Sequence, residues 1–194
     1  MKLTNLKTKF LGKNNKFYKE IDSTQSEIWR LIEEEKIQNG QLIFADIQTK
    51  GKGTHGRVWH TDEENNIAFS FYIETDCETE KLEGITIRIA EILVDIFKKK
   101  YGISLNIKEP NDLVYNSKKI GGILTESRIN SEKIKYLVIG IGINTNKTNF
   151  NDEIKDIASS IKKEFCIDVN REEIIEEFCF QFEAEIMRRL EKWK

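Results

Sequence analysis

The sequence predicts an α+β fold with a mixed, largely antiparallel sheet flanked by helices. Runs rich in β-branched and aromatic residues, bounded by turn residues, indicate strands, and only three segments have helical periodicity. Four of the strand-like runs follow one another between residues 103 and 144 as in hairpins, without the strand–helix alternation of a doubly wound fold. With 194 residues, the chain is long enough for one domain with a substantial core, and we expect a single domain over residues 1–194.

The N-terminal part is expected to start with a loose arm, because residues 1–16 are polar and basic. A short strand, KFYKEI, follows at residues 16–21. Residues 22–36 predict a helix, since Ser23 or Asp22 can cap it and apolar residues recur along one stripe. Residues 41–48 and 66–74 are typical of strands. The segment between them is rich in glycine and therefore predicts a loop.

The C-terminal part predicts two helices around a run of short strands. Residues 80–102 carry apolar side chains every three or four positions, and Gly102 ends the helix. Strands are expected at 103–109, 112–116, 118–129 and 133–144, and a last helix at 171–193. We expect the helices on one side of the sheet. We expect the apolar strand at 133–144 at the sheet edge, where it could pair across a two-fold axis or stay covered, so a homodimer is possible.

Composition excludes several classes of protein. The 31 Lys and Arg residues are balanced by 33 Asp and Glu residues, so the chain lacks the basic excess of a duplex-DNA-binding protein. The chain shows neither a signal peptide nor an apolar run of the ~18 residues that a membrane span needs. Cys77, Cys166 and Cys179 form no C-x-x-C pair, which favours free thiols. We therefore expect a cytoplasmic protein without a membrane or DNA partner.

The stretch QTKGKGTHGRVW, residues 48–59, contains a literal G-x-G-x-x-G. A dinucleotide-binding turn would need a helix after it, and residues 57–66 form a polar turn instead. A phosphate loop would need Lys and then Ser or Thr after Gly56, where Arg57 and Val58 stand. Glycines and cations together still suit an anion, phosphate or carboxylate. A plain flexible hairpin loop is the alternative.

Five motifs in one order resemble the catalytic domain of biotin protein ligases. They are DSTQ (22–25), the glycine loop (48–59), KEPNDL (108–113), KKIGGILTE (118–126) and GIGINTN (140–146). The resemblance runs from about residue 17 to the end. It implies a fold related to class II aminoacyl-tRNA synthetases. It also implies synthesis of biotinyl-5′-AMP from biotin and ATP with Mg²⁺, then biotin transfer to a lysine of a biotin carboxyl carrier domain.

The same resemblance implies the site residues. The biotin-binding set is Ser23, Thr24, Gln25, Gln48, Gly51, Lys52, Gly53, Trp59, Lys119, Gly121 and Gly122, and the adenylate-binding set is Lys52, Arg57, Asn111, Asp112, Lys119 and Asn144. Lys119, Arg57 and Asp112 are the expected catalytic residues, with Asp112 also the candidate for organising Mg²⁺. Lys119 is expected to bridge the biotin carboxylate and the α-phosphate, and its neighbour Lys118 is the alternative in register.

Each site residue also has an ordinary structural explanation. Ser23 could be only a helix cap, residues 111–112 only an Asn–Asp turn, and Lys119 only an exposed strand lysine. We expect Trp59 to be an apolar wall of the site or a core residue, and His60 to be a surface residue. Neither chemical step needs a protein nucleophile, which agrees with the lack of a convincing Ser–His–Asp or Cys–His set.

Three departures from the family pattern affect the prediction. The family loop is G-R-G-R-x-G-R, and Thr54 stands here in place of an arginine. Glu109 replaces the usual tryptophan of KEPND. The chain leaves no room for a helix-turn-helix before residue 17 or for a small β-barrel after the last helix, so we expect no sequence-specific DNA binding. A lipoate or octanoate ligase of the same fold, or a biotin-binding module without transfer activity, remains an alternative.

Overall fold

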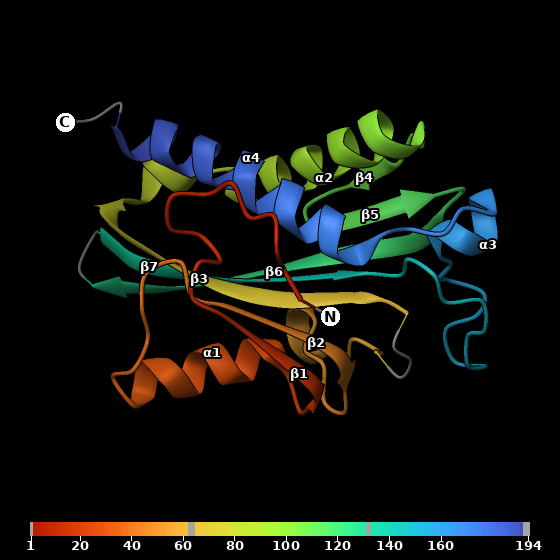
Figure 1. Ribbon diagram of the computed structural model, residues 1–194, viewed down its shortest axis with the longest axis horizontal. Coiled ribbons are helices and arrows are strands. Elements are labelled where there is room, and N and C mark those ends of the chain that lie inside the picture. The colour runs from red at the N-terminus through yellow and green to blue at the C-terminus, as the bar shows by residue number, and fades with distance from the viewer. Residues whose placement is uncertain (1, 62–64, 131–132, 192–194) are drawn as a thin grey trace.

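The computed structural model describes residues 2–61, 65–130 and 133–191 (Figure 1). Among them, seven strands form one sheet in the order β1-β2-β3-β7-β6-β5-β4. The elements, in chain order, are β1 (Asn15–Ile21), α1 (Thr24–Glu33), β2 (Leu42–Gln48), the 3-10 turn η1 (Thr54–Gly56), β3 (Ile67–Glu78), the 3-10 turn η2 (Thr79–Leu82), α2 (Ile85–Tyr101), β4 (Asn106–Lys108), β5 (Asp112–Tyr115), β6 (Lys118–Asn130), β7 (Lys133–Ile143), α3 (Ile161–Phe165) and α4 (Arg171–Glu191).

The sheet is mixed and largely antiparallel, as predicted. β1 and β2 pair in parallel, and the other five neighbouring pairs are antiparallel. Of the described helices, none is long and apolar enough to cross a membrane.

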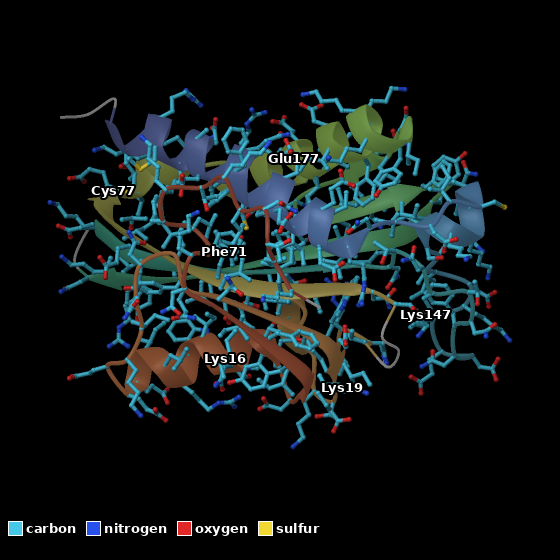
Figure 2. The ribbon with its side chains drawn as sticks, in the orientation of Figure 1. Lys16, Lys19, Phe71, Cys77, Lys147 and Glu177 are labelled. Atoms are coloured by element: carbon cyan, nitrogen blue, oxygen red, sulfur yellow. The ribbon has the colours of Figure 1, made fainter. Side chains whose placement is uncertain are left out.

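Helices cover both faces of the sheet, and the expectation of helices on one side was wrong. Figure 1 shows α1 below the sheet and α2 and α4 above it. The reason is the alternation of side chains along buried strands. Phe71 of β3 lies between the sheet and α4, with its ring centroid 5.9 Å from that of Phe178 and 5.1 Å from that of Phe182 (Figure 2). The next residue, Tyr72, packs instead with Ile28 of α1.

β7 lies in the middle of the sheet, so the expectation of an edge strand was also wrong. It pairs with β3 on one side and with β6 on the other. Residues 137–141 are buried in succession, which is the pattern of a strand covered on both faces. The sheet edges are β1 and β4. The backbone of β7 is therefore already paired on both sides and cannot join a second copy of the chain.

Several element boundaries differ from the expectation. The helix expected at 80–102 is split, because Gly84 has a φ of 70° between η2 and α2. The strand expected at 103–109 is only Asn106–Lys108, and the short α3 was not predicted. The last helix ends at Glu191 in the described part, and residues 192–193 of the expected helix lie outside the described residues.

The N-terminal arm is docked, and the expectation of a loose arm was wrong. Two buried glutamates of α4 accept hydrogen bonds from its backbone. Glu176 Oε1 accepts from the N–H groups of residues 4 and 5 at 2.6 and 2.7 Å. The Glu183 carboxylate accepts from those of residues 9, 10 and 11 at 2.6, 2.9 and 2.9 Å. Leu3 and Leu11 are buried against the core. A polar, basic composition did not reveal these contacts, because they use backbone groups.

Candidate active site

Two cavities that share a wall lie over the central strands. The first, called the inner cavity, is lined by Ser23, Thr24, Gln25, Gln48, Lys52, Gly53, Thr54, Trp59, Phe69, Ser70, Asn111, Lys119, Gly122, Ile123, Leu124, Gly140, Ile141 and Gly142. The second, called the outer cavity, is lined by Gly53, Thr54, Arg57, Val58, Trp59, His60, Lys119, Asn144, Glu153, Ile154, Ile157 and Ala158. The four residues common to both are Gly53, Thr54, Trp59 and Lys119. The arrangement can hold two ligands side by side, or one ligand in two parts.

The start of α1 supplies the uncharged polar end of the inner cavity. Ser23 is the N-cap, and its Oγ accepts from the Ser26 N–H at 3.4 Å. Thr24 donates from its N–H and its Oγ1 to Gln48 Oε1 at 2.8 and 3.0 Å, and its Oγ1 lies 2.8 Å from Ser70 Oγ. Ser23 therefore does cap the helix, and it also lines the cavity. These groups are held in place before any ligand arrives.

The glycine loop folds back on itself as a narrow ribbon. The Trp59 N–H donates to Gly51 O at 2.9 Å, and the Gly53 N–H donates to Arg57 O at 2.8 Å. A Cβ on Gly51 would lie 2.2 Å from Trp59 O, so only glycine fits there. At the tip, Arg57 Nη2 donates to Thr54 Oγ1 at 2.8 Å. Thr54 thus orients the exposed guanidinium of Arg57 within the loop.

Trp59 forms the apolar wall between the cavities. Its indole lies directly over two glycines of the sheet: a Cβ on Gly142 would come within 2.3 Å of the ring, and one on Gly122 within 3.4 Å. The Trp59 Nε1–H group is buried without a hydrogen-bond partner among the described residues. Glycines at these positions leave room for a flat ring against the sheet. The expectation of an apolar wall agrees with this placement.

Lys119 lies where the two cavities meet. Its Nζ is 2.6 Å from Asp112 Oδ1, a close ion pair without the angles of an aligned hydrogen bond. The ammonium also lies 5.7 Å from the Trp59 ring centroid. The Lys119 N–H donates to Ile157 O at 2.8 Å, and its carbonyl accepts from Ser159 N–H at 2.9 Å, so residues 157–159 hold the lysine backbone.

Asn111 and Asn144, the two asparagines of the predicted adenylate-binding set, are each held by a hydrogen bond from the side chain to a backbone carbonyl. Asn111 Nδ2 donates to Ile123 O at 3.0 Å, and Asn144 Nδ2 donates to Ser159 O at 3.1 Å. Asn111 reaches the inner cavity and Asn144 the outer one. Each side-chain amide is thus held by a backbone carbonyl.

Some predicted residues lie elsewhere than expected. Gly121 faces away from the cavities, since a Cβ there would lie 3.2 Å from the buried Leu113 Cδ1 on the face covered by α2 and α4. A bulge at Ile120 in the pairing of β6 with β5 interrupts the alternation of side chains, so Ile120 and Gly121 face the same core. Gly51 lines neither cavity and acts through the loop backbone. His60, expected at the surface, borders the outer cavity. Glu109 is exposed, so its charge points to solvent.

Sequence reasoning missed three kinds of site residue. Gly140 and Gly142 line the inner cavity, and their spacing of two along one strand was a signal that they share a face. Ser70 also lines the inner cavity, and the signal for it was a polar residue inside an otherwise apolar strand. Ile154 and Ile157 line the outer cavity from an irregular segment that has no periodicity to detect. No cluster of three or more His, Cys, Asp or Glu side chains suited to a metal ion occurs in the described part of the chain.

The fold and the paired cavities define a mixed-sheet domain with a glycine-rich loop beside its candidate ligand site. Residues 17–144 match the model of the biotin/lipoate A/B protein ligase family, and the chain belongs to this family. The bifunctional ligase/repressor BirA of Bacillus subtilis is 34% identical over 180 residues, which are 92% of this chain and 55% of that protein. Biotin–protein ligase 2 of Arabidopsis thaliana is 34% identical over 76% of this chain and 46% of its own length.

A solved structure of biotin protein ligase from Aquifex aeolicus in complex with biotin and ATP has a similar fold. It superposes with a TM-score of 0.72 at 30% identity, covering 94% of this chain and 72% of that one. The present chain spans about half the length of the curated relatives that it matches.

Proposed function

We propose that the protein is a biotin protein ligase, which activates biotin with ATP and transfers it to a lysine of a biotin carboxyl carrier domain. The observation that carries this proposal is the position of Lys119 at the junction of the two cavities. Uncharged hydroxyls and amides at the far end of the inner cavity suit a neutral ureido ring. The similarity to ligases solved with biotin and ATP supports the same assignment.

In the first step, a biotin carboxylate oxygen attacks the α-phosphorus of ATP, an O–P bond forms and pyrophosphate leaves with the electron pair of the broken bond. In the second step, a carrier amine attacks the acyl carbon of the mixed anhydride, AMP leaves and the amine loses a proton. Lys119 would lie between two anions and reduce their repulsion as negative charge develops. No covalent enzyme intermediate is needed.

The outer cavity would hold the nucleotide. Val58 and Ile157 are 62% and 64% exposed, which is unusual for large apolar side chains and suits contact with a flat base. Arg57 stands at the same rim and can pair with a phosphate. Asn144 lines the same cavity and can read a base or a ribose through its amide oxygen.

Mg²⁺ would be held mainly by the phosphates of ATP, which is usual for this ion. Asp112 is the carboxylate that we expect to assist, since its Oδ1 already lies 2.6 Å from Lys119 Nζ. Binding of two anions would draw Lys119 away from this carboxylate and free its oxygens. The ion would neutralise phosphate charge, and the protein residues would orient the carboxylate toward phosphorus.

The test is incubation with ATP, Mg²⁺, biotin and a carrier domain, followed by mass spectrometry of the carrier. Addition of one biotinyl group to a carrier lysine supports the ligase. Tight biotin binding without transfer would indicate the biotin-binding module. Titration with lipoate and octanoate separates the other members of the family, because tighter binding of these acids than of biotin would contradict the proposal.

We further propose that the chain acts as one catalytic domain in the cytoplasm. Cys77, Cys166 and Cys179 are free, which agrees with a reducing compartment. The net charge of −2 does not favour DNA as a partner, and a gel-shift titration with duplex DNA tests this. A homodimer through β7 is excluded by its central position, and sedimentation velocity would show whether another surface associates.

A further inference from the structure

The side-chain amide of Gln25 has a defined orientation. Its Nε2 donates to Glu126 Oε2 at 2.9 Å and to Val138 O at 3.2 Å. A backbone carbonyl can only accept hydrogen bonds, and so can an ionised carboxylate. The nitrogen must therefore face these two groups, and the amide oxygen must face the other way.

The Gln25 oxygen is left as a buried acceptor at the inner cavity. Gln25 is 3% exposed, and its Oε1 has no hydrogen-bond partner among the described residues. The oxygen lies over Gly140, where a Cβ would come within 2.7 Å of it. A buried acceptor without a partner is unfavourable, so a ligand that donates a hydrogen bond here gains affinity.

Glu126 contacts two residues of α1 with one oxygen. Besides Gln25, its Oε2 accepts from Trp29 Nε1 at 2.7 Å. Glu126 is on β6 and does not line the inner cavity, and its contact with that cavity runs through Gln25. It borders an adjoining cavity beside the glycine loop, which shares Lys52, Gly53 and Leu124 with the inner one. Two donors on one oxygen keep the carboxylate an acceptor toward Gln25 and prevent the amide from flipping.

We propose that Glu126 is a positioning residue that fixes Gln25 Oε1 as the acceptor for a ring N–H of the ligand. This inference rests on the proposed function, in which the ring is the ureido ring of biotin. The dithiolane ring of lipoate has no N–H group and would leave the Gln25 oxygen unsatisfied. Glu126 thereby contributes to the choice of biotin over other acids that the same fold could activate.

The test compares Glu126→Ala, Glu126→Gln and the control Ser127→Ala, whose side chain is exposed on the same strand. A glutamine at 126 can place its own oxygen at the Oε2 position and keep both hydrogen bonds. Each variant is titrated by calorimetry with biotin and with two analogues in which one or the other ureido N–H is replaced by oxygen. Thermal unfolding of each variant is measured in parallel.

For the wild type, we expect biotin to bind about tenfold more tightly than the analogue that lacks the N–H facing Gln25. Glu126→Ala should weaken biotin binding about tenfold and bring the ratio between biotin and that analogue close to one. Glu126→Gln and Ser127→Ala should keep the wild-type ratio. These results would establish the positioning role.

A wild-type ratio retained in Glu126→Ala, with a lower melting temperature, would overturn the inference and leave Glu126 as a tie between α1 and the sheet. A wild type that binds biotin equally well with and without either N–H would overturn it too. Failure of the proposed function has a different signature, because the wild type would then bind lipoate or octanoate in preference to biotin.

Discussion

Lys118 and Lys119 are adjacent and chemically identical side chains that the fold places in different surroundings. Lys119 borders both cavities and lies 2.6 Å from Asp112, whereas Lys118 lines neither cavity. In the sequence, the spacing to the following glycines favoured Lys119 over Lys118. In the structure, Lys119 is the one of the two that borders the cavities. Strand alternation explains the difference, because successive side chains point to opposite faces.

Replacing Lys119 with methionine should slow adenylate formation by roughly 10²–10³-fold, since a preorganised cation at a reacting phosphate contributes on that scale. Pyrophosphate release at saturating biotin and ATP measures the rate. Lys118→Met is the matched control and should keep most of the activity. Equal losses in the two variants would contradict the assignment of Lys119.

Thr54 stands where the family has an arginine, and it lines both cavities. We predict that Thr54→Arg lowers the dissociation rate of biotinyl-AMP by about tenfold, because a second guanidinium can donate to the adenylate phosphate. Stopped-flow chase with excess unlabelled ligand measures this rate. Thr54→Ser keeps the hydroxyl that accepts from Arg57 and should match the wild type. Equal dissociation rates in Thr54→Arg and the wild type would refute this prediction.

At the scale of elements, α4 has a role that its sequence did not suggest. It covers the sheet, and it also holds the N-terminal arm through Glu176 and Glu183. Glutamates in a helix usually face solvent, yet these two are 9% and 6% exposed. They substitute for strand partners by accepting from backbone groups that belong to no sheet.

Glu183→Ala should lower the free energy of unfolding by about 3 kcal/mol, because three N–H groups lose their acceptor and two of them are near the core. Urea unfolding measures the loss. Trypsin should also cleave the released arm at Lys7 and Lys9 faster than in the wild type. Glu177→Ala on the same helix is the control, since the Glu177 carboxylate accepts from Gln181 Nε2 and holds no backbone group of the described part of the arm. Unchanged stability in Glu183→Ala would show that the arm contributes little.

The ion pair between Arg30 and Asp22 at the start of α1 predicts that the stability of the protein falls at low pH. Arg30 donates to both oxygens of Asp22 at 2.8 Å, and this lowers the pKa of Asp22 to about 2. Because the pKa of Asp22 is lower in the folded state, the ion pair stabilises the fold above pH 3.8, which is the pKa in the unfolded chain. This stabilisation is lost as the pH falls through about 2. The Asp22 side chain is 39% exposed, so solvent screening limits the effect to about 1 kcal/mol or less.

In Arg30→Gln, the unfolding free energy should be lower than in the wild type at pH 6, and the two proteins should converge between pH 4 and pH 2. Urea unfolding at several pH values measures this difference. Lys36→Gln serves as the control, because Lys36 and its partner Glu34 are 68% and 53% exposed. A difference that stays constant down to pH 2 would argue against the ion pair as its origin.

At the scale of the whole molecule, the site is assembled from segments that are distant in the chain. The start of α1, the glycine loop, β3, β6, β7 and the segment at 154–158 all meet at the two cavities. The central position of β7 makes this possible, because it brings Gly142 under Trp59 and Gly140 under the side-chain amide of Gln25. Glycines in a central strand leave space where other side chains would fill it.

The sequence by itself determined the fold class and most of the elements in their order, because periodicity and turn residues are local properties of the chain. Its short motifs carried the resemblance to biotin protein ligases, and the expected site residues follow from that resemblance. The strand order, the docking of the arm and the contact of Glu126 with Gln25 were decided only by the tertiary structure. Each depends on which surfaces of distant segments meet, such as β3 with β7 or the arm with α4, and no local pattern records that choice.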